Sequence, residues 1–353
     1  MKKDVDLRFS LPSPSSKVNS VLDMLNGKAV SRQEPNKIEI WARQAAQGDA
    51  QAQYELAKAL TSGNPLAEKN REAVKWLKKA AEKEHAQSEH LLGVLIARGQ
   101  GIRPNSQKAA ELFRAAATFG YAPAQYDLAR CLTWGFGCEK NPKEALTWFR
   151  LAAAQGHALS QQESAYAYLN GNGCAVDLRQ ATSYLRAAVL SGLSENCTAL
   201  GELYLREDNP ARNENEAIRW IKEAAGDGQP RAQYLLALFY ESGRIRPEKA
   251  DISLVWAVRS AENNYLPAYL LCARILQTSD KALPQAQIKA LAILLRAERL
   301  YLQENRKDAP SEYELRRKEA ELTLADSQIK IAKILSGKPI GITEILRYDC
   351  PSC

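Results

Sequence analysis

The chain has 353 residues, of which 45% are apolar and 25% charged, and these values are ordinary for a soluble globular protein. The net charge of +7 comes from 48 basic and 41 acidic side chains spread along the sequence, without the concentrated basic stripe of a nucleic-acid reader. Asp4, Asp6 and Arg8 interrupt any signal-peptide core, and no run of about 18 apolar residues could span a membrane. We therefore expect a cytoplasmic protein with no nucleic-acid partner and no membrane span.

Residues 1–37 are rich in Pro, Ser and charge, which predicts a flexible N-terminal arm. Within it only the segment SVLDML (20–25) has the pattern of a short amphipathic helical turn. This segment could dock on the body of the protein or on a partner, and its weak amphipathicity favours the first of these.

Residues 38–301 repeat with a period of 36, and no insertion or deletion interrupts the register. Several positions keep one residue type from repeat to repeat. One is small: Ala57, Gly93, Ala129, Ala165, Gly201, Ala237 and Ala273. Another is large and mostly aromatic: Trp76, Leu112, Trp148, Tyr184, Trp220 and Trp256. So many positions in register indicate stacked copies of one structural unit.

Each repeat is predicted to be a pair of helices. The run AQAQYELAKALTSG (50–63) has apolar residues at helical spacing and ends in a glycine suited to a left-handed cap, which predicts helix A. The run REAVKWLKKAAEKE (71–84) predicts helix B. One hairpin cannot bury its own apolar face, so neighbouring hairpins must cover each other. We expect backbones to approach closely at the small position and the Trp position to pack between repeats.

After Tyr301 the period stops. Ser311 and Glu314 form a capping box behind Pro310, and a long helix is predicted to run towards Gly337. We interpret residues 302–337 as a C-terminal capping helix. Residues 338–353 form a tail that ends in a Cys-x-x-Cys motif.

These motifs resemble the Sel1-like repeat family, a relative of the tetratricopeptide repeats. The family motif is matched in the first repeat by Ala50, Ala52, Gln53, Tyr54 and Leu56. It is matched again, over its whole length, by Ala122, Ala124, Gln125, Tyr126, Leu128, Gly135, Gly137, Ala145, Trp148, Ala152, Ala153 and Gly156. The resemblance implies an all-α, right-handed α-solenoid of about seven repeats that acts as a protein-binding adaptor, often in bacteria. Two repeats depart from the pattern: the fifth has REDNPARN (206–213) in place of the glycine loop, and the seventh lacks both the glycine and the Trp.

The face of helix A opposite the uniform positions varies between repeats, and related arrays use this face as their concave binding surface. We predict a protein- or peptide-binding groove there, because Trp, Tyr and Arg are common in binding hot spots. Its residues are Arg98, Arg130, Trp134, Tyr166, Asn170 and Arg206. The alternative, held equally open, is that Trp134 and Tyr166 pack against neighbouring helices. Further along, Leu235, Leu238 and Leu271 could extend the groove, although coverage by the C-terminal helix is favoured.

No motif predicts a cofactor or a catalytic site. The Gly-x-Gly loops recur between helices and never follow a strand, so they are not phosphate cradles. His85 and His90 are five residues apart and do not share a helical face. Seven cysteines, an odd number, argue for reduced thiols. Cys350 and Cys353 are weak metal candidates: they could form half of a zinc site, but tail thiols without a role are the favoured interpretation.

The sequence thus favours a non-catalytic adaptor that binds a protein or peptide on the helix A face, with its oligomeric state open. Two alternatives remain. One is a hydrolase or cysteine-dependent enzyme of the cysteine-rich Sel1 type, and the other is an assembly subunit of an envelope or secretion complex.

Overall fold

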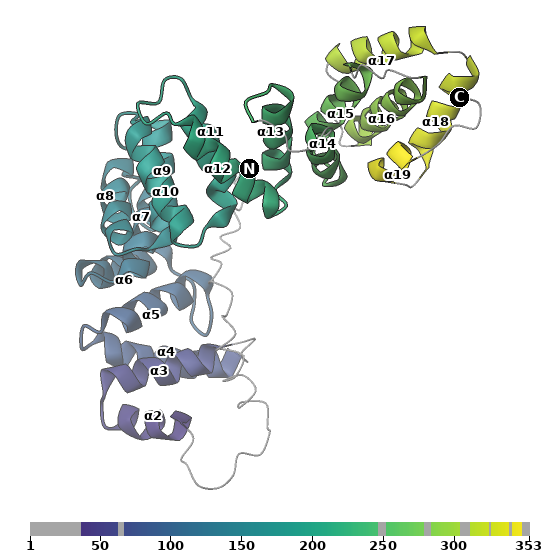
Figure 1. Cartoon of the computed structure of the whole chain (residues 1–353). Helices are drawn as coiled ribbons and strands as arrows, with labels where there is room; N and C mark the ends of the chain where they lie inside the picture. Colours follow the sequence, from purple (N-terminus) through teal and green to yellow (C-terminus); the bar gives the residue numbers. More distant parts are fainter. Residues whose placement is uncertain are drawn as a thin grey trace. The chain divides into compact units, whose positions relative to one another are not determined.

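The computed structural model describes residues 37–62, 67–245, 252–278, 284–303, 311–324, 326–338 and 341–347. In these ranges every regular element is a helix, and consecutive helices pair as hairpins (Figure 1). The predicted N-terminal arm, apart from its last residue Lys37, and the Cys-x-x-Cys motif lie outside the described residues. The chain divides into two compact units, residues 1–160 and 161–353, with the boundary inside helix α9 (Ala158–Asn170).

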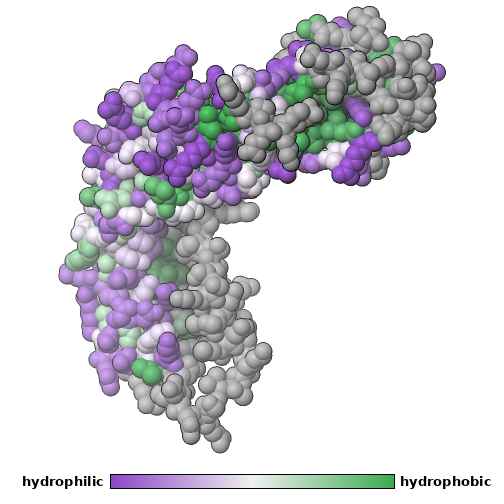
Figure 2. All heavy atoms as spheres, viewed as in Figure 1, coloured by the Kyte–Doolittle hydropathy of each residue, from purple (hydrophilic) through white to green (hydrophobic). Residues whose placement is uncertain are grey.

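The first unit is a stack of helix pairs. Its helices are α2 (Lys37–Ala46), α3 (Ala50–Thr61), α4 (Ala67–Ala81), α5 (Ala86–Arg98), α6 (Ser106–Thr118), α7 (Ala122–Trp134) and α8 (Pro142–Ala154). Within a repeat α3 packs on α4, α5 on α6 and α7 on α8, whereas α4–α5 and α6–α7 form the contacts between repeats. Its described surface in Figure 2 is mostly hydrophilic with scattered apolar spots, so the apolar residues are largely used inside the stack.

The second unit continues the same pairing. After α9 its helices are α10 (Leu178–Leu190), α11 (Cys197–Leu205), α12 (Glu214–Gly226), α13 (Pro230–Glu241), α14 (Ile252–Glu262), α15 (Leu266–Thr278), α16 (Pro284–Gln303), α17 (Ser311–Thr323), α18 (Asp326–Gly337) and α19 (Ile342–Arg347). A single 3₁₀ turn (Ser194–Asn196) precedes α11, which is shorter than the other A helices. The stacked rings of Tyr168 and Tyr184, 5.8 Å apart, join α9 to α10.

Capping residues recur with the period of the repeat. The residue before helix B is Asn105, Asn141, Asp177 or Asn213, and in each case its side-chain oxygen accepts a hydrogen bond from the backbone N–H three residues later. Such a bond satisfies one of the free N–H groups at a helix start. At the end of helix A, Gly99 and Gly135 adopt the left-handed conformation that ends a helix. The start of helix B and the end of helix A in these repeats are therefore fixed by local sequence.

The small position is where two helices of a repeat approach closely, as predicted. A methyl group added to Gly93 would lie 2.7 Å from the Phe113 ring, and one added to Gly201 would lie 2.5 Å from Ile221. The second glycine of the Gly-x-Gly loop has a similar role between repeats. A Cβ at Gly137 would collide with the backbone of Ser106, at the start of the preceding helix B. The space beside this glycine is occupied by the backbone of the preceding repeat. This agrees with the prediction that the Gly-x-Gly loops are structural and are not phosphate-binding loops.

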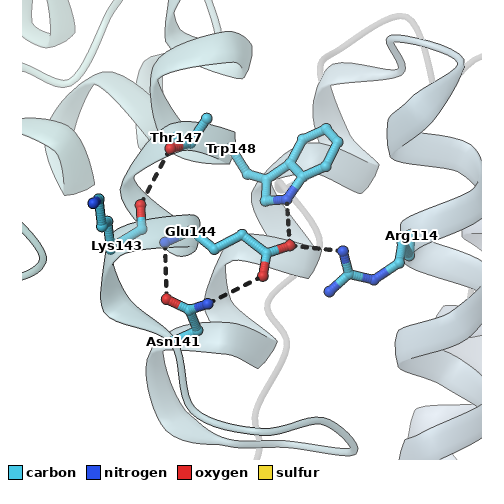
Figure 3. Close-up of polar contacts among 6 residues, drawn as sticks. All are labelled: Arg114, Asn141, Lys143, Glu144, Thr147 and Trp148. Carbon is cyan, nitrogen blue, oxygen red and sulfur yellow. Dashed lines mark hydrogen bonds and ion pairs between the residues drawn. The ribbon is translucent and has the colours of Figure 1, made fainter.

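At the Trp position of α8 and of α12, the indole is bonded to a Glu of its own helix (Figure 3 shows α8). Trp148 donates its indole N–H to Glu144 one turn earlier, at 3.2 Å, and the same carboxylate oxygen accepts a 2.6 Å bond from Arg114 on α6. Glu144 therefore joins the Trp of one repeat to helix B of the repeat before it. Trp220 donates in the same way to Glu216, at 3.1 Å.

The C-terminal region differs from the prediction of one long capping helix. Residues 311–337 form two helices, α17 and α18, and a third short helix, α19, follows. Both α17 and α18 pack on α16, where Ala320, Leu324, Ala332 and Leu335 are buried. Helix α17 also contacts α15, whose Leu271 is buried, whereas Leu235 and Leu238 on α13 are only partly buried.

Candidate protein-binding face

We call the side of the A helices that carries the varying positions the helix A face. In the first unit it includes residues in register with Glu55, Lys58 and Ser62, among them Asp127, Arg130 and Trp134 on α7. The uniform positions of α7 point the other way, since Ala124, Leu128, Ala129 and Leu132 are buried. On the helix A face of α7, Trp134 is exposed and Arg130 is partly exposed, whereas Asp127 is buried.

Trp134 is the most exposed predicted groove residue of the first unit, with 65% of its surface accessible. It is the last residue of α7 and is followed by the left-handed Gly135. The guanidinium of Arg130, one turn earlier, lies 5.7 Å from the centre of the Tyr126 ring. Arg98 is half-buried at the end of α5, and burial lowers its pKa while the charge of Asp127 opposes the shift.

A polar seam runs between the A helices of the first unit. His90 on α5 and Asp127 on α7 approach within 2.8 Å, and both side chains are largely buried. The His90 ring also lies against Tyr121, with 5.3 Å between ring centres. At the N-terminal end of α5, His85 contacts Ser88 at 2.8 Å and Gln51 of the preceding repeat at 3.1 Å. Both histidines thus hold one repeat to the next.

In the second unit the helix A face contains a hollow of about 350 Å³. Its walls are apolar, contributed by helices α9, α10 and α11: Ala165, Leu169, Ala181, Leu185, Ala199 and Leu203. Tyr166, Glu202, Arg206 and Arg231 also line it and bring polar groups to an otherwise apolar space. A concave apolar site with a few polar groups is the usual form of a ligand-binding pocket.

The polar groups of the hollow are held by neighbouring residues. The Tyr166 hydroxyl donates to the amide oxygen of Asn196 at 3.2 Å, and Arg231 forms an ion pair with Glu202 on α11. Arg206, the residue that ends α11, binds Asp208 through two bonds of 3.0 and 2.7 Å. This last pair belongs to the loop that departs from the glycine pattern. The loop is anchored by the buried Asn209, which donates to Thr182 and to the Leu203 carbonyl.

The six predicted groove residues fall into the two units. Arg98, Arg130 and Trp134 belong to the first, and Tyr166, Asn170 and Arg206 to the second. Tyr166 and Arg206 line the hollow, whereas Asn170 is exposed at the end of α9 and does not line it. The prediction omitted Glu202 and Arg231, although both occupy varying helix A positions. The signal that could have identified them is their opposite charge at positions about one repeat apart in the sequence, which allows an ion pair between neighbouring A helices.

Four of the five described cysteines have thiols whose pKa is raised by burial. Burial raises the pKa of Cys131 to about 12 and that of Cys197 to about 11, and it also raises the pKa of Cys138 and Cys272. Such thiols stay protonated, whereas a nucleophilic or metal-binding cysteine is a thiolate. Within the described ranges no group of three His, Cys, Asp or Glu residues is arranged to hold a metal ion. The weak candidates Cys350 and Cys353 are outside these ranges.

Helix pairs that recur at a constant spacing in the sequence and stack on one another define the class of all-α solenoid repeat proteins. The sequence model of the Sel1 repeat matches residues 50–85, 86–120, 122–157, 158–193, 197–228 and 230–265, more than half of the chain. The protein therefore belongs to the Sel1 repeat family. Six repeats are matched where about seven were predicted, and residues 266–301, which contain α15 and most of α16, are not among them.

Solved structures support the same fold. A Sel1 repeat protein from Oxalobacter formigenes is 27% identical, covers 65% of this chain and 91% of its own, and gives a TM-score of 0.55. The protective antigen c5321 of uropathogenic Escherichia coli strains, which displays an SLR fold, is 20% identical, covers 90% of this chain and 83% of its own, and gives a TM-score of 0.60. No curated protein matches the sequence. Among the helices described here, none has the length and apolar character needed to cross a membrane.

Proposed function

We propose that this protein is a non-catalytic adaptor that holds a protein or peptide on its helix A face. The observation that carries the proposal is the hollow of the second unit, whose apolar walls meet Tyr166, Glu202, Arg206 and Arg231. A peptide offers what this site requires, because its apolar side chains fill the walls and its polar backbone meets the charged groups. Sel1 repeats serve in general as scaffolds for protein interactions, which agrees with this use.

Trp134 supports the same role in the first unit. It lies outside the Trp position that anchors helix B, so the repeat scaffold does not require it. A large aromatic side chain that is 65% exposed loses the stabilisation it would gain from burial. Trp, Tyr and Arg dominate binding hot spots, and in the first unit this face offers one Trp and two Arg, namely Trp134, Arg130 and Arg98. We infer that Trp134 is retained for contact with a partner.

The chemistry of the described residues supports a role without catalysis. We also propose that the protein acts in the cytoplasm. All three histidines make structural contacts: His85 with Ser88, His90 with Asp127, and His157 with Ser160. The protonated thiols described above lack the activation that a cysteine-dependent enzyme needs. No observation favours the hydrolase or the assembly-subunit alternative.

The proposal is tested by capture of partners from native lysate on immobilised protein. Wild type is compared with Tyr166→Ala and Trp134→Ala, and with Leu190→Ala as a matched control. Leu190 is 68% exposed on helix B α10 and lies outside the hollow, so its loss removes exposed apolar surface elsewhere. Thermal melting of each variant is measured separately.

We expect a partner that is retained by wild type and by Leu190→Ala but lost with Tyr166→Ala or Trp134→Ala, at unchanged melting temperature. Removing a hot-spot aromatic weakens binding by about 2 kcal/mol or more, which is roughly thirtyfold. Equal capture by all four proteins, or loss that follows melting temperature, would reject the helix A face as the binding site.

A further inference from the structure

The outer side of helix α4 carries an unusual set of side chains. Arg71, Lys75 and Lys79 are spaced by four residues, so they form one row along the helix. All three are exposed, and with Glu72 and Trp76 they line a shallow hollow of about 600 Å³. The opposite side of α4 is core, where Ala73, Val74, Leu77 and Ala80 are buried. The hollow therefore lies on helix B, away from the helix A face.

In two other repeats, those of α8 and α12, the corresponding positions are closed by internal bonds. Trp148 and Trp220 each donate their indole N–H to the Glu one turn earlier, and Glu144 also accepts from Arg114. Trp76 and Glu72 have the same spacing, but no hydrogen bond joins them. Instead the Lys79 ammonium lies 4.6 Å from the centre of the Trp76 ring. The indole N–H of Trp76 and the carboxylate of Glu72 therefore do not bond to each other.

Within the described part of the chain, the three cations also lack acidic partners at ion-pair distance. Among the described residues none forms an ion pair with Arg71, Lys75 or Lys79. The contact that Arg114 and Glu144 make between two helices B has no counterpart one repeat earlier. There the equivalent residues are Lys78 and Lys108, which are both positively charged. Lys108 is paired with Glu111 of its own helix. The hollow on α4 therefore carries three cations and one carboxylate, Glu72, beside an aromatic ring, and its net charge is positive.

We propose that this hollow is a second docking surface, for an acidic peptide segment with carboxylates at helical spacing. The guanidinium, the two ammonium groups and the indole N–H are all donors that carboxylates accept. Carboxylates repeated every four residues on a partner helix match the spacing of the row. Glu72 inside the hollow repels a dense run of phosphates but can pair with a basic side chain of a mixed-charge peptide, which favours a protein partner over a nucleic acid or membrane.

Exposed ion pairs are individually weak and are screened by salt, so this contact depends on several charges acting together. The surface is distinct from the proposed groove. Changes on α4 should leave capture through Tyr166 and Trp134 intact, and the groove variants should leave binding at α4 intact. The two proposals can therefore fail separately.

The probe is a fluorescein-labelled helical peptide with Glu at every fourth position, and its counterpart has Gln at the same places. Binding is followed by fluorescence anisotropy at low and high salt. The variant is Arg71→Glu/Lys75→Glu/Lys79→Glu. The control Arg103→Glu/Lys140→Glu/Lys143→Glu reverses three other exposed cations of the same unit and changes the net charge equally. Circular dichroism melting shows that each variant is folded.

We expect wild type to bind the Glu peptide and not the Gln peptide, with loss at high salt. The α4 variant should bind the Glu peptide at least about tenfold more weakly, because attraction becomes repulsion at three sites. The control should lose much less, and the α4 variant should gain affinity for a Lys peptide of the same spacing. No binding by wild type, an equal loss in the control, or tighter binding to duplex DNA or anionic vesicles would overturn the assignment.

Discussion

His90 Nε2 lies 2.8 Å from Asp127 Oδ2, so helix A of one repeat is bonded directly to helix A of the next. Both side chains are largely buried, at 14% and 12% exposure, and the contact is therefore little screened by water. His90→Ala leaves the Asp127 carboxylate without this partner, and we expect it to cost about 1–3 kcal/mol of unfolding free energy.

Urea unfolding of His90→Ala, Asp127→Ala and the double variant measures this cost. The double variant should lose less than the sum of the single variants, by about 0.5 kcal/mol or more, as for residues in direct contact. The exposed pair Lys108 and Glu111 is the control, with an expected coupling of about 0.3–0.5 kcal/mol. Additive losses at His90 and Asp127 would mean that the contact contributes nothing of its own.

A second prediction concerns Glu89, which replaces the glutamine found at the equivalent position of several other repeats. At this position Gln53, Gln125 and Gln233 each donate a side-chain N–H to a carbonyl at the end of the preceding helix B. A carboxylate cannot donate there, and one oxygen of the buried Glu89 has no hydrogen-bond partner. Burial, together with the charge of Glu84, raises the pKa of Glu89. We expect Glu89→Gln to stabilise the protein by about 1 kcal/mol at neutral pH.

The sign of the pH effect follows from that raised pKa. The stabilising, protonated form of Glu89 is fully present below the ordinary value of 4.5, and its contribution is lost as pH rises through the folded-state pKa. The advantage of Glu89→Gln over wild type should therefore grow from pH 4.5 towards neutrality. Chemical unfolding across this range measures the difference, and an advantage independent of pH would contradict the burial of a charged carboxylate as its cause.

Glu84 itself provides a third prediction. It has a φ of 56°, and the corresponding residue in five other repeats is a glycine with positive φ, from Gly48 to Gly228. The left-handed conformation is strained for a residue with a Cβ, so Glu84→Gly should gain about 1 kcal/mol, less the extra entropy of the unfolded chain. Combination with Glu89→Gln should give less than the sum, because Glu84 also raises the pKa of Glu89. A melting temperature below that of wild type would contradict this account.

Much of the fold could be predicted because the period of 36 residues constrains both local structure and packing. The small position at Gly93 and the second glycine at Gly137 identify close approaches that only a stack of helix pairs requires. The break between α17 and α18 could not be predicted. No Gly or Pro lies between Ser311 and Ser336, so local propensity favours one helix. Packing on α16 decides instead, since Ala320 and Leu335 are both buried in its core.

For the candidate site, the sequence could predict which side of the A helices is involved, but not which residues on that side come together. The register placed Tyr166 and Arg206 on the varying face, and both line the hollow. It could not show that Asn170 lies outside the hollow or that Arg231 on α13 reaches Glu202 on α11. Such contacts depend on how adjacent helix pairs tilt, which a repeat pattern does not encode. The polar seam of His90 and Asp127 was missed for the same reason.

The fourth prediction separates steric from conformational roles of glycine. Gly137 and Gly120 both have positive φ, at 70° and 83°. A Cβ at Gly120 meets nothing within 4 Å, whereas one at Gly137 collides with the Ser106 backbone. Gly120→Ala should therefore cost about 1 kcal/mol, from backbone strain alone. Gly137→Ala should cost at least about 2 kcal/mol because α6 or the loop must also move. Equal losses in thermal or urea unfolding would show that the loop is not packed on α6.

The fifth prediction is a loss of stability in mild acid through His157. Its Nδ1 accepts the backbone N–H of Ser160 at 3.3 Å, and its ring packs on Tyr126 with 5.1 Å between ring centres. Burial lowers the pKa of His157 below its ordinary 6.5, against an opposing effect of Asp127. The unfolded chain therefore binds a proton at a higher pH than the folded protein does. Stability from this residue is complete above pH 6.5 and declines as pH falls through the folded-state pKa.

His157→Gln tests this prediction, because Gln229 occupies the equivalent position before α13 and shows that the amide is compatible with the turn. Unfolding free energies should fall less steeply between pH 6.5 and pH 5 in the variant than in wild type, and the two proteins should differ least above pH 6.5. Burial also lowers the pKa of His85, so part of the slope should persist. An unchanged slope would show that protonation of His157 is not opposed by the fold, and that the Ser160 N–H does not hold Nδ1 in its unprotonated form.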